Sequence, residues 1–175
     1  GEIMFQDLKI SKARKEDAQK VLEFLNIVGG ESDNLLFGEN EFKNMPVKRE
    51  MEIIENINSS DKSVMFVGKI GEEIVSIGSL QGLTGRTRIA HRGRLAISVK
   101  KKYWNQGIGT KMMEELIAFA KDIAKLEVIE LEVRSDNLSA IRLYEKFGFK
   151  RIGLYKKYFK IGEEYFDALL MNLYL

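Results

Sequence analysis

Two stretches near the start of the chain repeat apolar residues with the period of an α-helix. Over residues 16–26 the apolar positions recur three and four residues apart, at Ala18, Val21, Leu22 and Leu25. Gly29-Gly30 then gives a stop signal. A second helix is predicted to begin at Pro46, a residue favoured in a first helical turn, with its apolar face formed by Val47, Met51 and Ile54.

The remaining pattern alternates between strands and helices. Short β-rich runs are predicted at Leu8–Lys12, Val64–Ile70 and residues 74–80, the last two forming a hairpin around Gly71. A longer strand is predicted over residues 89–99, where one face carries Ile89, His91, Gly93, Leu95, Ile97 and Val99. Next come a helix over 108–124, a strand over 128–133, a helix over 139–147 ended by Gly148, and two strands near 149–159 and 165–174. This order indicates an α/β domain with a mixed sheet of six or seven strands.

Composition narrows the possible classes of protein. The 175 residues include one proline and no low-complexity stretch, so we expect a single domain over residues 4–175, with residues 1–3 a vector-derived remnant. The absence of cysteine excludes disulfide scaffolds and thiolate metal sites, and a single histidine, His91, excludes a multi-histidine site. The net charge of +2 provides no general field for nucleic acid, and no apolar run could span a bilayer. We expect a cytoplasmic protein without a metal and without nucleic-acid or membrane partners.

A glycine-containing loop stands between the strand that ends at Val99 and the helix from 108. Gly107 and Gly109 allow close approach of the backbone, and the free N–H groups of a helical first turn, aided by the helix dipole, suit a phosphate or pyrophosphate. The spacing matches neither a Walker loop nor the Gly-x-Gly-x-x-Gly fingerprint, because Met112 stands three residues after Gly109. A plain strand-to-helix turn is the alternative for this segment taken by itself.

A second segment, residues 137–149, reads Asn-Leu-Ser-Ala-Ile-Arg-Leu-Tyr-Glu-Lys-Phe-Gly-Phe and directly follows a predicted strand. Together the two segments resemble the GNAT superfamily of acyl-CoA-dependent N-acetyltransferases. The loop matches the family's Gly-x-Gly, and the second segment matches its Asn-x-x-Ala-x-x-x-Tyr-x-x-x-Gly-Phe in full, through Asn137, Ala140, Tyr144, Gly148 and Phe149. One departure is Trp104, which occupies the position of the family's usual Arg or Gln. The variant is similar to the branch of ribosomal-protein, amino-acid and diamine acetyltransferases.

The resemblance implies a single-domain GNAT-like fold, with a mostly antiparallel sheet covered by helices on both faces, and acetyl-CoA as co-substrate. It places the cofactor on Ile97, Ser98, Val99, Asn105, Gln106, Gly107, Ile108, Gly109, Thr110, Asn137, Ser139, Tyr144 and Lys146. Backbone groups of Ile97 and Val99 would bond the pantetheine arm as an added strand does. Tyr144 would donate a proton to the departing thiolate, and packing in a short helix is its alternative role.

The general base is less directly indicated. Where many family members carry a Glu on the strand before the loop, this sequence has Gly93. His91 lies two residues earlier on the same predicted face, and an imidazole is suited to deprotonating an amine directly or through water. A role in ordering the strand end is the alternative for His91.

Two clusters of charge remain. Seven basic residues with no acidic residue among them could attract the cofactor's phosphates, with nucleic-acid binding as the competing role and a solvated sheet edge as the plain structural alternative. They are Arg86, Arg88, Arg92, Arg94, Lys100, Lys101 and Lys102. Between the first two predicted helices, Glu31, Asp33, Glu39 and Glu41 surround Leu35, Leu36 and Phe37. The family builds part of its acceptor site here, so Glu31, Leu36 and Phe37 are the predicted acceptor contacts, with a solvated acidic loop as the alternative.

These observations predict an N-acetyltransferase that acts on a primary amine, preferably a small amine or an amino acid. The alternatives are a protein N-terminal acetyltransferase and a non-catalytic acyl-CoA-binding sensor. A monomer and a homodimer are both compatible with the sequence.

Overall fold

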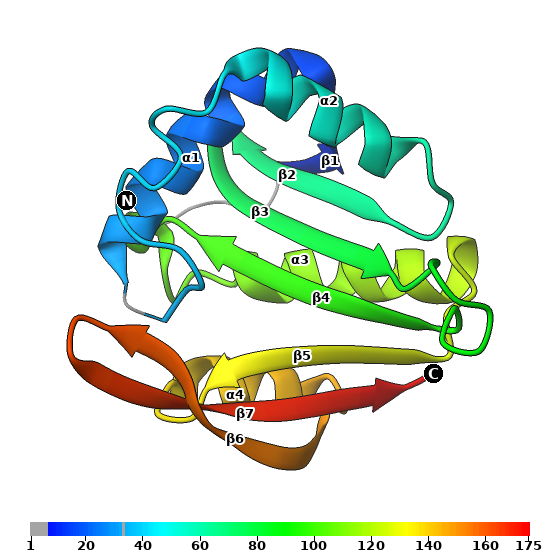
Figure 1. Cartoon of the computed structure of the whole chain (residues 1–175). Helices are drawn as coiled ribbons and strands as arrows, with labels where there is room; N and C mark the ends of the chain where they lie inside the picture. The colour runs from blue at the N-terminus through cyan, green and yellow to red at the C-terminus, as the bar shows by residue number, and fades with distance from the viewer. Residues whose placement is uncertain (1–6, 33) are drawn as a thin grey trace.

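The computed structural model describes residues 7–32 and 34–175, so the predicted remnant at residues 1–3 lies outside the described residues. Seven strands form one sheet in the order β1-β2-β3-β4-β5-β7-β6 (Figure 1). The strands are β1 (Leu8–Lys12), β2 (Val64–Ile70), β3 (Glu73–Gly82), β4 (Arg92–Val99), β5 (Val128–Arg134), β6 (Lys150–Ile161) and β7 (Glu164–Tyr174). All neighbours are antiparallel except β4 and β5, as the expected mostly antiparallel sheet requires.

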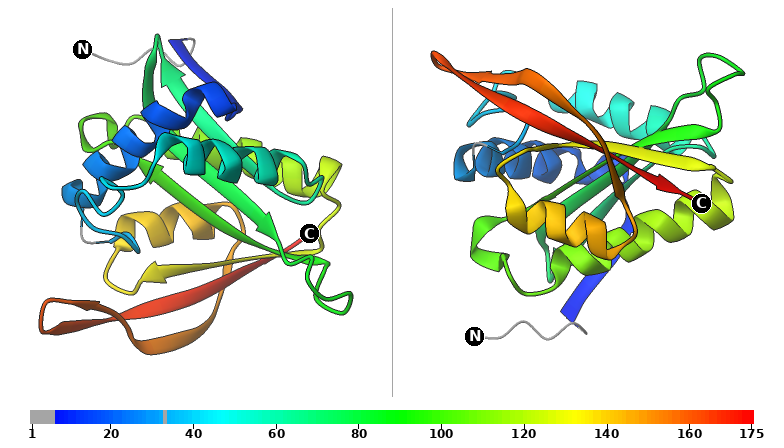
Figure 2. Two further views of the ribbon diagram at one scale, coloured as in Figure 1. Left: turned by 45° about the horizontal axis from the view of Figure 1, so that its top comes forward. Right: turned by 90° about the horizontal axis from the view of Figure 1, so that it is seen from below.

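Helices cover both faces of this sheet. They are α1 (Ala18–Glu31), α2 (Val47–Asn58), α3 (Ile108–Ala118) and α4 (Leu138–Lys146), with the short turns η2 (Lys15–Asp17), η3 (Lys101–Tyr103) and η4 (Phe119–Ile123). In Figure 1, α1 and α2 lie in front of β1–β3, whereas α3 and α4 lie behind the sheet. Figure 2 shows the same separation from above and below. Among residues 7–32 and 34–175, no helix therefore lies over the front of the β4–β5–β7–β6 half, and we call this surface the open face.

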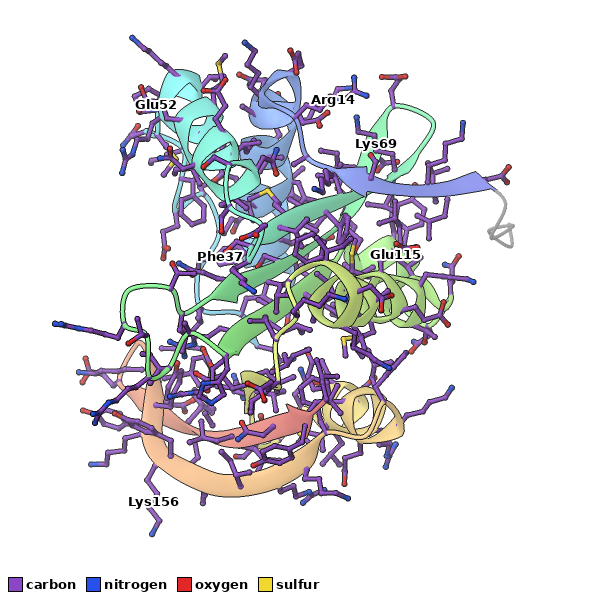
Figure 3. All side chains as sticks on the ribbon, turned by 90° about the vertical axis from the view of Figure 1, so that its right-hand side faces the viewer. Arg14, Phe37, Glu52, Lys69, Glu115 and Lys156 are labelled. Atoms are coloured by element: carbon purple, nitrogen blue, oxygen red, sulfur yellow. The ribbon has the colours of Figure 1, made fainter. Side chains whose placement is uncertain are left out.

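The two helical layers enclose two apolar clusters (Figure 3). Behind the sheet, Met112, Met113 and Leu116 of α3 are fully buried against β2–β5. A Cβ atom at Gly78 of β3 would come within 2.6 Å of the Met112 side chain, so this glycine lets the helix lie directly on the sheet. In front, Val21, Phe24 and Val28 of α1 pack with Ile54 of α2. The helix predicted over 108–124 is continuous here, although residues 119–123 widen into a π-turn.

Two predicted boundaries were wrong. Gly29-Gly30 does not end the first helix, because α1 continues through both glycines to Glu31. The strand predicted over 89–99 begins only at Arg92, because the backbone before it turns: the Ile89 N–H donates to the Arg86 carbonyl and the Arg92 N–H to the Ile89 carbonyl. His91 is thus an exposed turn residue outside the strand. No helix within the described ranges is long and apolar enough to cross a bilayer.

Candidate active site

The site is built where β4 and β5 separate. Their ladder joins only Arg92, Gly93 and Arg94 to Val128–Glu130, after which the two strands diverge. The other edge of β4 stays paired with β3 as far as Val99. The edge of Leu95–Val99 that faces β5 consequently lies beyond the last paired position. A cavity of about 500 Å³ opens beside it, with Ile97, Ser98 and Val99 in its wall.

The loop between β4 and α3 forms the second wall. Asn105 (φ 60°) and Gly107 (φ 81°) both adopt left-handed conformations, which turn the chain sharply into the helix. The Lys111 N–H donates to the Gly107 carbonyl, so the preceding N–H groups of Ile108, Gly109 and Thr110 come before the first intrahelical bond. These residues line the cavity. The N-terminus of α3 therefore directs unpaired donors and the positive end of its dipole toward the cavity, as an anion site requires.

Helix α4 supplies the third wall. The Asn137 side chain caps it by accepting from the Ala140 N–H at 3.3 Å, and Asn137, Ser139, Ala140, Leu143 and Tyr144 all face the cavity. Tyr144 is 9 % exposed and packs on Phe149 with 5.9 Å between ring centroids. Burial, reinforced by the charge of Glu132, raises the pKa of Tyr144 to about 12. The hydroxyl therefore keeps its proton at neutral pH and is available as a hydrogen-bond donor.

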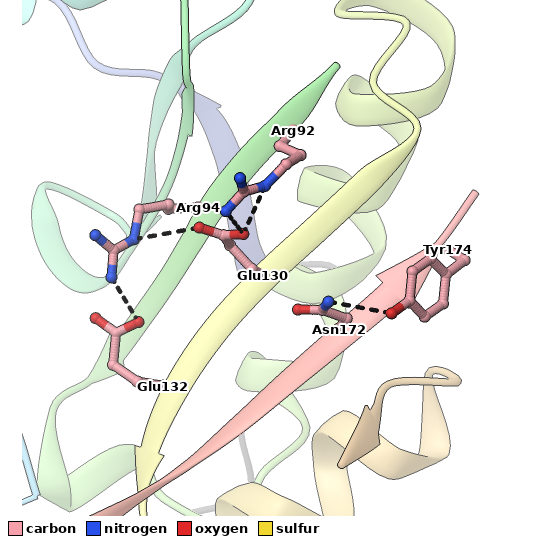
Figure 4. Close-up of polar contacts among 6 residues, drawn as sticks. All are labelled: Arg92, Arg94, Glu130, Glu132, Asn172 and Tyr174. Carbon is pink, nitrogen blue, oxygen red and sulfur yellow. Dashed lines mark hydrogen bonds and ion pairs between the residues drawn. The ribbon is translucent and has the colours of Figure 1, made fainter. Parts of the chain in front are cut away.

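Sequence reasoning missed the carboxylate of Glu132. Along β5, Ile129, Leu131 and Val133 enter the core behind the sheet, so Glu130 and Glu132 project onto the open face. There Arg94 Nη2 donates to Glu132 at 3.0 Å, and Arg92 Nη2 donates to Glu130 at 2.6 Å (Figure 4). The Glu132 side chain is only 16 % exposed. Its charge also contributes to raising the pKa of Tyr158 on β6, after burial, and that of Tyr144 on the other side of the sheet. A carboxylate on the open face and a protonated phenol behind it thus flank the separation between β4 and β5.

The sequence-predicted cofactor residues mostly meet in this cavity. Ile97, Ser98, Val99, Asn105, Gly107, Ile108, Gly109, Thr110, Asn137, Ser139 and Tyr144 all line it. Gln106 and Lys146 do not: the Gln106 amide donates back to the Lys102 carbonyl, and Lys146 is exposed near the end of α4. Trp104, which stands where the resemblance expects Arg or Gln, lines the wall and donates its indole N–H to the Val99 carbonyl at 2.8 Å.

His91 is not placed to act as a base in this cavity. It lies before β4, where its carbonyl accepts from the Glu127 and Val128 N–H groups, whereas the cavity opens beside the far end of that strand. Six residues separate His91 from Ile97, which at ~3.3 Å per residue is about 20 Å. Gly93 offers no substitute, because a Cβ there would lie 2.6 Å from the Leu126 side chain.

Only one of the three predicted acceptor contacts lines the cavity. Glu31 lines the cavity, where its carboxylate accepts from the Lys101 N–H at 3.1 Å. Leu36, by contrast, is 66 % exposed, and Phe37 packs into the front cluster. Leu35, one position earlier, lines the cavity in their place. Asp33 of the predicted acidic group lies outside the described residues.

The predicted basic group is largely paired rather than solvated. Arg92 and Arg94 bond Glu130 and Glu132 across the strand pair, and Lys100 and Lys102 bond Glu73. The sequence could not show this, because every acidic partner comes from another strand.

Comparison with known proteins agrees with this geometry. The model of the acetyltransferase (GNAT) family matches residues 34–149. The chain belongs to this family. The resemblance drawn from the two motifs is confirmed.

Curated relatives differ in their acceptors. The chain is 36% identical over 86 residues to the L-amino acid N-acetyltransferase AaaT of Escherichia coli, and 35% identical over 90 residues to the N-alpha-acetyltransferase RimI of Mycobacterium tuberculosis. Each match covers 49% of this chain, and it spans about half of the relative, 53% and 54% respectively.

Solved structures match over nearly the whole chain. A GNAT acetyltransferase from Streptococcus pneumoniae superposes with a TM-score of 0.91 at 28% identity, covering 96% of this chain and 99% of that one. The acetyltransferase yncA from Salmonella typhimurium, solved with its cofactor acetyl-CoA, reaches 0.83 at 16% identity, over 97% of this chain and 94% of that one. The expected fold is confirmed.

Proposed function

We propose that this chain transfers the acetyl group of acetyl-CoA to a primary amine. The observation that carries the proposal is that the diverging edge of β4, the open N-terminus of α3 and the protonated Tyr144 share one cavity. When bound, acetyl-CoA supplies an activated acetyl thioester. The comparison with the acetyl-CoA complex of yncA supports this choice of ligand.

The residues present fit such a ligand. The N–H groups of Ile108, Gly109 and Thr110 suit a pyrophosphate, because they combine unpaired donors with the positive end of a helix dipole. The β4 edge beyond Arg94 offers backbone groups of Ile97 and Val99 to an extended, amide-containing arm. A Cβ at Gly109 would meet Leu143 at 3.3 Å, so the absence of a side chain keeps the loop and α4 close.

Proton transfer is assigned to two residues on opposite sides of the sheet. Tyr144, behind the sheet, holds a proton for the departing thiolate, since its pKa of about 12 keeps it protonated. Glu132, on the open face, takes the proton of the attacking amine. We assign this role to Glu132 and not to His91 because Glu132 lies on the open face just beyond the last paired position of β4 and β5, whereas His91 lies in the turn before β4.

For the acceptor we propose a small amine or an amino acid. An amino acid carries an ammonium and a carboxylate a few ångströms apart, and Glu132 and Arg94 present the two complementary charges 3.0 Å from each other. The relationship to an L-amino acid N-acetyltransferase supports this class. The relationship to RimI supports the second candidate, a protein N-terminal amine, which has no free α-carboxylate.

A thiol-release assay tests the proposal and separates the candidates. Acetyl-CoA is mixed with the protein and with free amino acids, the same amino acids as amides, diamines, or short peptides with a free N-terminus. Turnover of amino acids that falls on amidation supports the proposed class, and turnover of peptides alone supports the second candidate. Acetyl-CoA binding with no turnover on any amine would indicate the sensor alternative, and no binding at all would refute the proposal.

A further inference from the structure

One carboxylate from the neighbouring strand β3 binds three side chains of the loop between β4 and α3. Glu73, the first residue of β3, accepts from the Tyr103 hydroxyl at 2.7 Å and from Lys100 Nζ at 3.1 Å. Lys102 Nζ lies 3.1 Å from the same carboxylate. Residues 100–106, which we call the cofactor loop, are thereby fixed to a strand that contributes no residue to the cavity wall.

Other contacts hold the same loop by its backbone. The Lys100 N–H donates to the Val75 carbonyl at 2.9 Å, and the Lys101 N–H donates to Glu31 of α1 at 3.1 Å. Glu73 differs from these contacts because it engages three side chains at once, and one of them, Tyr103, itself lines the cavity.

The position of Tyr103 bears on the anion site. Only three residues stand between it and Gly107, and the two left-handed residues between Tyr103 and α3 fix the direction in which the helix starts. A displaced Tyr103 would therefore alter both the cavity wall and the orientation of the first-turn N–H groups.

The electrostatics around Glu73 favour a persistent contact. Burial opposes ionisation, but hydrogen bonds from Tyr103, Lys102 and Lys100 lower the pKa of Glu73 to about 2. The Lys100 side chain is only 15% exposed, so its ammonium would be poorly solvated without this partner.

We propose that Glu73 is a positioning residue for acetyl-CoA: its carboxylate holds the cofactor loop in the shape that presents the N-terminus of α3 to the pyrophosphate. This inference rests on the proposed function. Glu73 is absent from the cavity wall, so it acts through Tyr103, Lys100 and Lys102 and not by contact.

A purely electrostatic role and a positioning role for Glu73 predict opposite changes in CoA affinity when its charge is removed. If the residue acted only through its charge, removing it would leave the loop more positive and tighten the binding of a phosphorylated ligand. If it positions the loop, removing it weakens binding despite the gain in positive charge. The sign of the change in affinity therefore decides between the two.

The experiment titrates CoA into the acceptor-free protein by calorimetry, and follows the emission of Trp104, the only tryptophan of the chain. The variants are Glu73→Gln and Tyr103→Phe. The matched control is Glu72→Gln, because Glu72 precedes Glu73, has a side chain 93% exposed, and pairs only weakly with Lys20 at 3.3 Å. It removes the same charge from the same hairpin without touching the loop.

We expect Glu73→Gln and Tyr103→Phe each to raise the Kd for CoA about tenfold, as the loss of hydrogen bonds to a charged group implies. Glu72→Gln should stay within about twofold of the original protein, as exposed ion pairs contribute little. In steady-state assays the two loop variants should raise the KM for acetyl-CoA and leave kcat at saturating acetyl-CoA within about threefold. The lost contacts stabilise the ground state and the transition state equally, so their loss affects KM and not kcat.

Three results would overturn the inference. The first is CoA binding by Glu73→Gln that is as tight as, or tighter than, that of Glu72→Gln. The second is an unchanged Kd in Tyr103→Phe, which decides the matter even if Glu73→Gln fails to fold. The third is failure of the unsubstituted protein to bind CoA, which would remove the proposed function as well. When the unsubstituted protein binds CoA, a negative result in the variants counts against the positioning role alone.

Discussion

Replacing Glu132 with Gln tests the assignment of the base most directly. The substitution keeps the length and nearly the volume of the side chain, so packing on β5 is preserved. It also keeps an oxygen that can accept from Arg94, now 3.0 Å from Glu132. What disappears is the negative charge and the ability to accept a proton from the acceptor's ammonium group, which must become a neutral amine before it can attack the thioester.

Glu132→Gln should lower kcat strongly and the unfolding free energy only slightly. A positioned general base contributes about 10²–10⁴ in rate, so kcat should fall by that factor, equivalent to about 2.7–5.4 kcal/mol in the activation free energy. The unfolding free energy should change by only about 1 kcal/mol or less, because Arg94 is half exposed and its ion pair is screened by water.

The matched control is Glu130→Gln. Glu130 lies two residues earlier on the same face of β5 and pairs with Arg92 at 2.6 Å, but it stands opposite Arg94 in the last paired register of β4 and β5. Both variants lose one carboxylate from one ladder of ion pairs, yet only Glu132 acts on Tyr144.

The assay is steady-state thiol release with an accepted amine, measured with thermal unfolding of each variant. The deficit of Glu132→Gln should shrink as the pH rises toward the pKa of the amine, since an already neutral nucleophile needs no base. A kcat for Glu132→Gln within about threefold of that for Glu130→Gln, far from the general-base range, would refute the assignment.

Three further predictions follow from the same site. Tyr144→Phe should lower kcat by about 10²–10⁴ with CoA affinity unchanged, whereas near-normal turnover would make Tyr144 a packing residue. Gly109→Asp should abolish CoA binding measured by calorimetry in a protein that still folds, because it puts a negative charge at the N-terminus of α3. The control is Gly109→Asn, which adds a side chain of nearly the same size without the charge and should weaken binding less. Glu73 has a pKa lowered from 4.5 to about 2, so its contribution to stability is complete above about pH 4.5 and is lost as the pH falls toward 2. The difference in melting temperature between the original protein and Glu73→Gln should accordingly narrow over that interval, and a constant difference would contradict this.

Much of the site could be predicted from local sequence. Gly107 and Gly109 mark a turn between a strand and a helix, and the N-terminal donors of such a helix are a local property of the backbone. Asn137 and Tyr144 belong to one short helix, so their common orientation also follows from their spacing.

The proposed base, Glu132, could not be found in this way. The alternation of Glu130 and Glu132 with Ile129 and Leu131 signals one polar face of a strand, but not what lies across that face. Only the pairing of β5 with β4 shows that Glu132 stands where the strands separate. The sequence indicated His91 instead, because it is the single imidazole of the chain. In the structure His91 lies in the turn before Arg92, at the end of β4 away from the cavity. The prediction for the acceptor segment was also off by one position, because Leu35 and not Leu36 faces the cavity, while Phe37 packs against the front cluster.

The ladder between β4 and β5 is also the shortest connection within the sheet. Three ladder positions join the sheet of β1–β4 to that of β5–β7, although each half is internally paired over much longer stretches. The cavity lies along this seam, with walls from both halves. A ligand bound there clamps the halves together, and at a hundred times its Kd it adds about 2.7 kcal/mol to the unfolding free energy. Resistance to proteolysis between residues 118 and 128, where the chain crosses from one half to the other, would then rise and fall with the supply of acetyl-CoA.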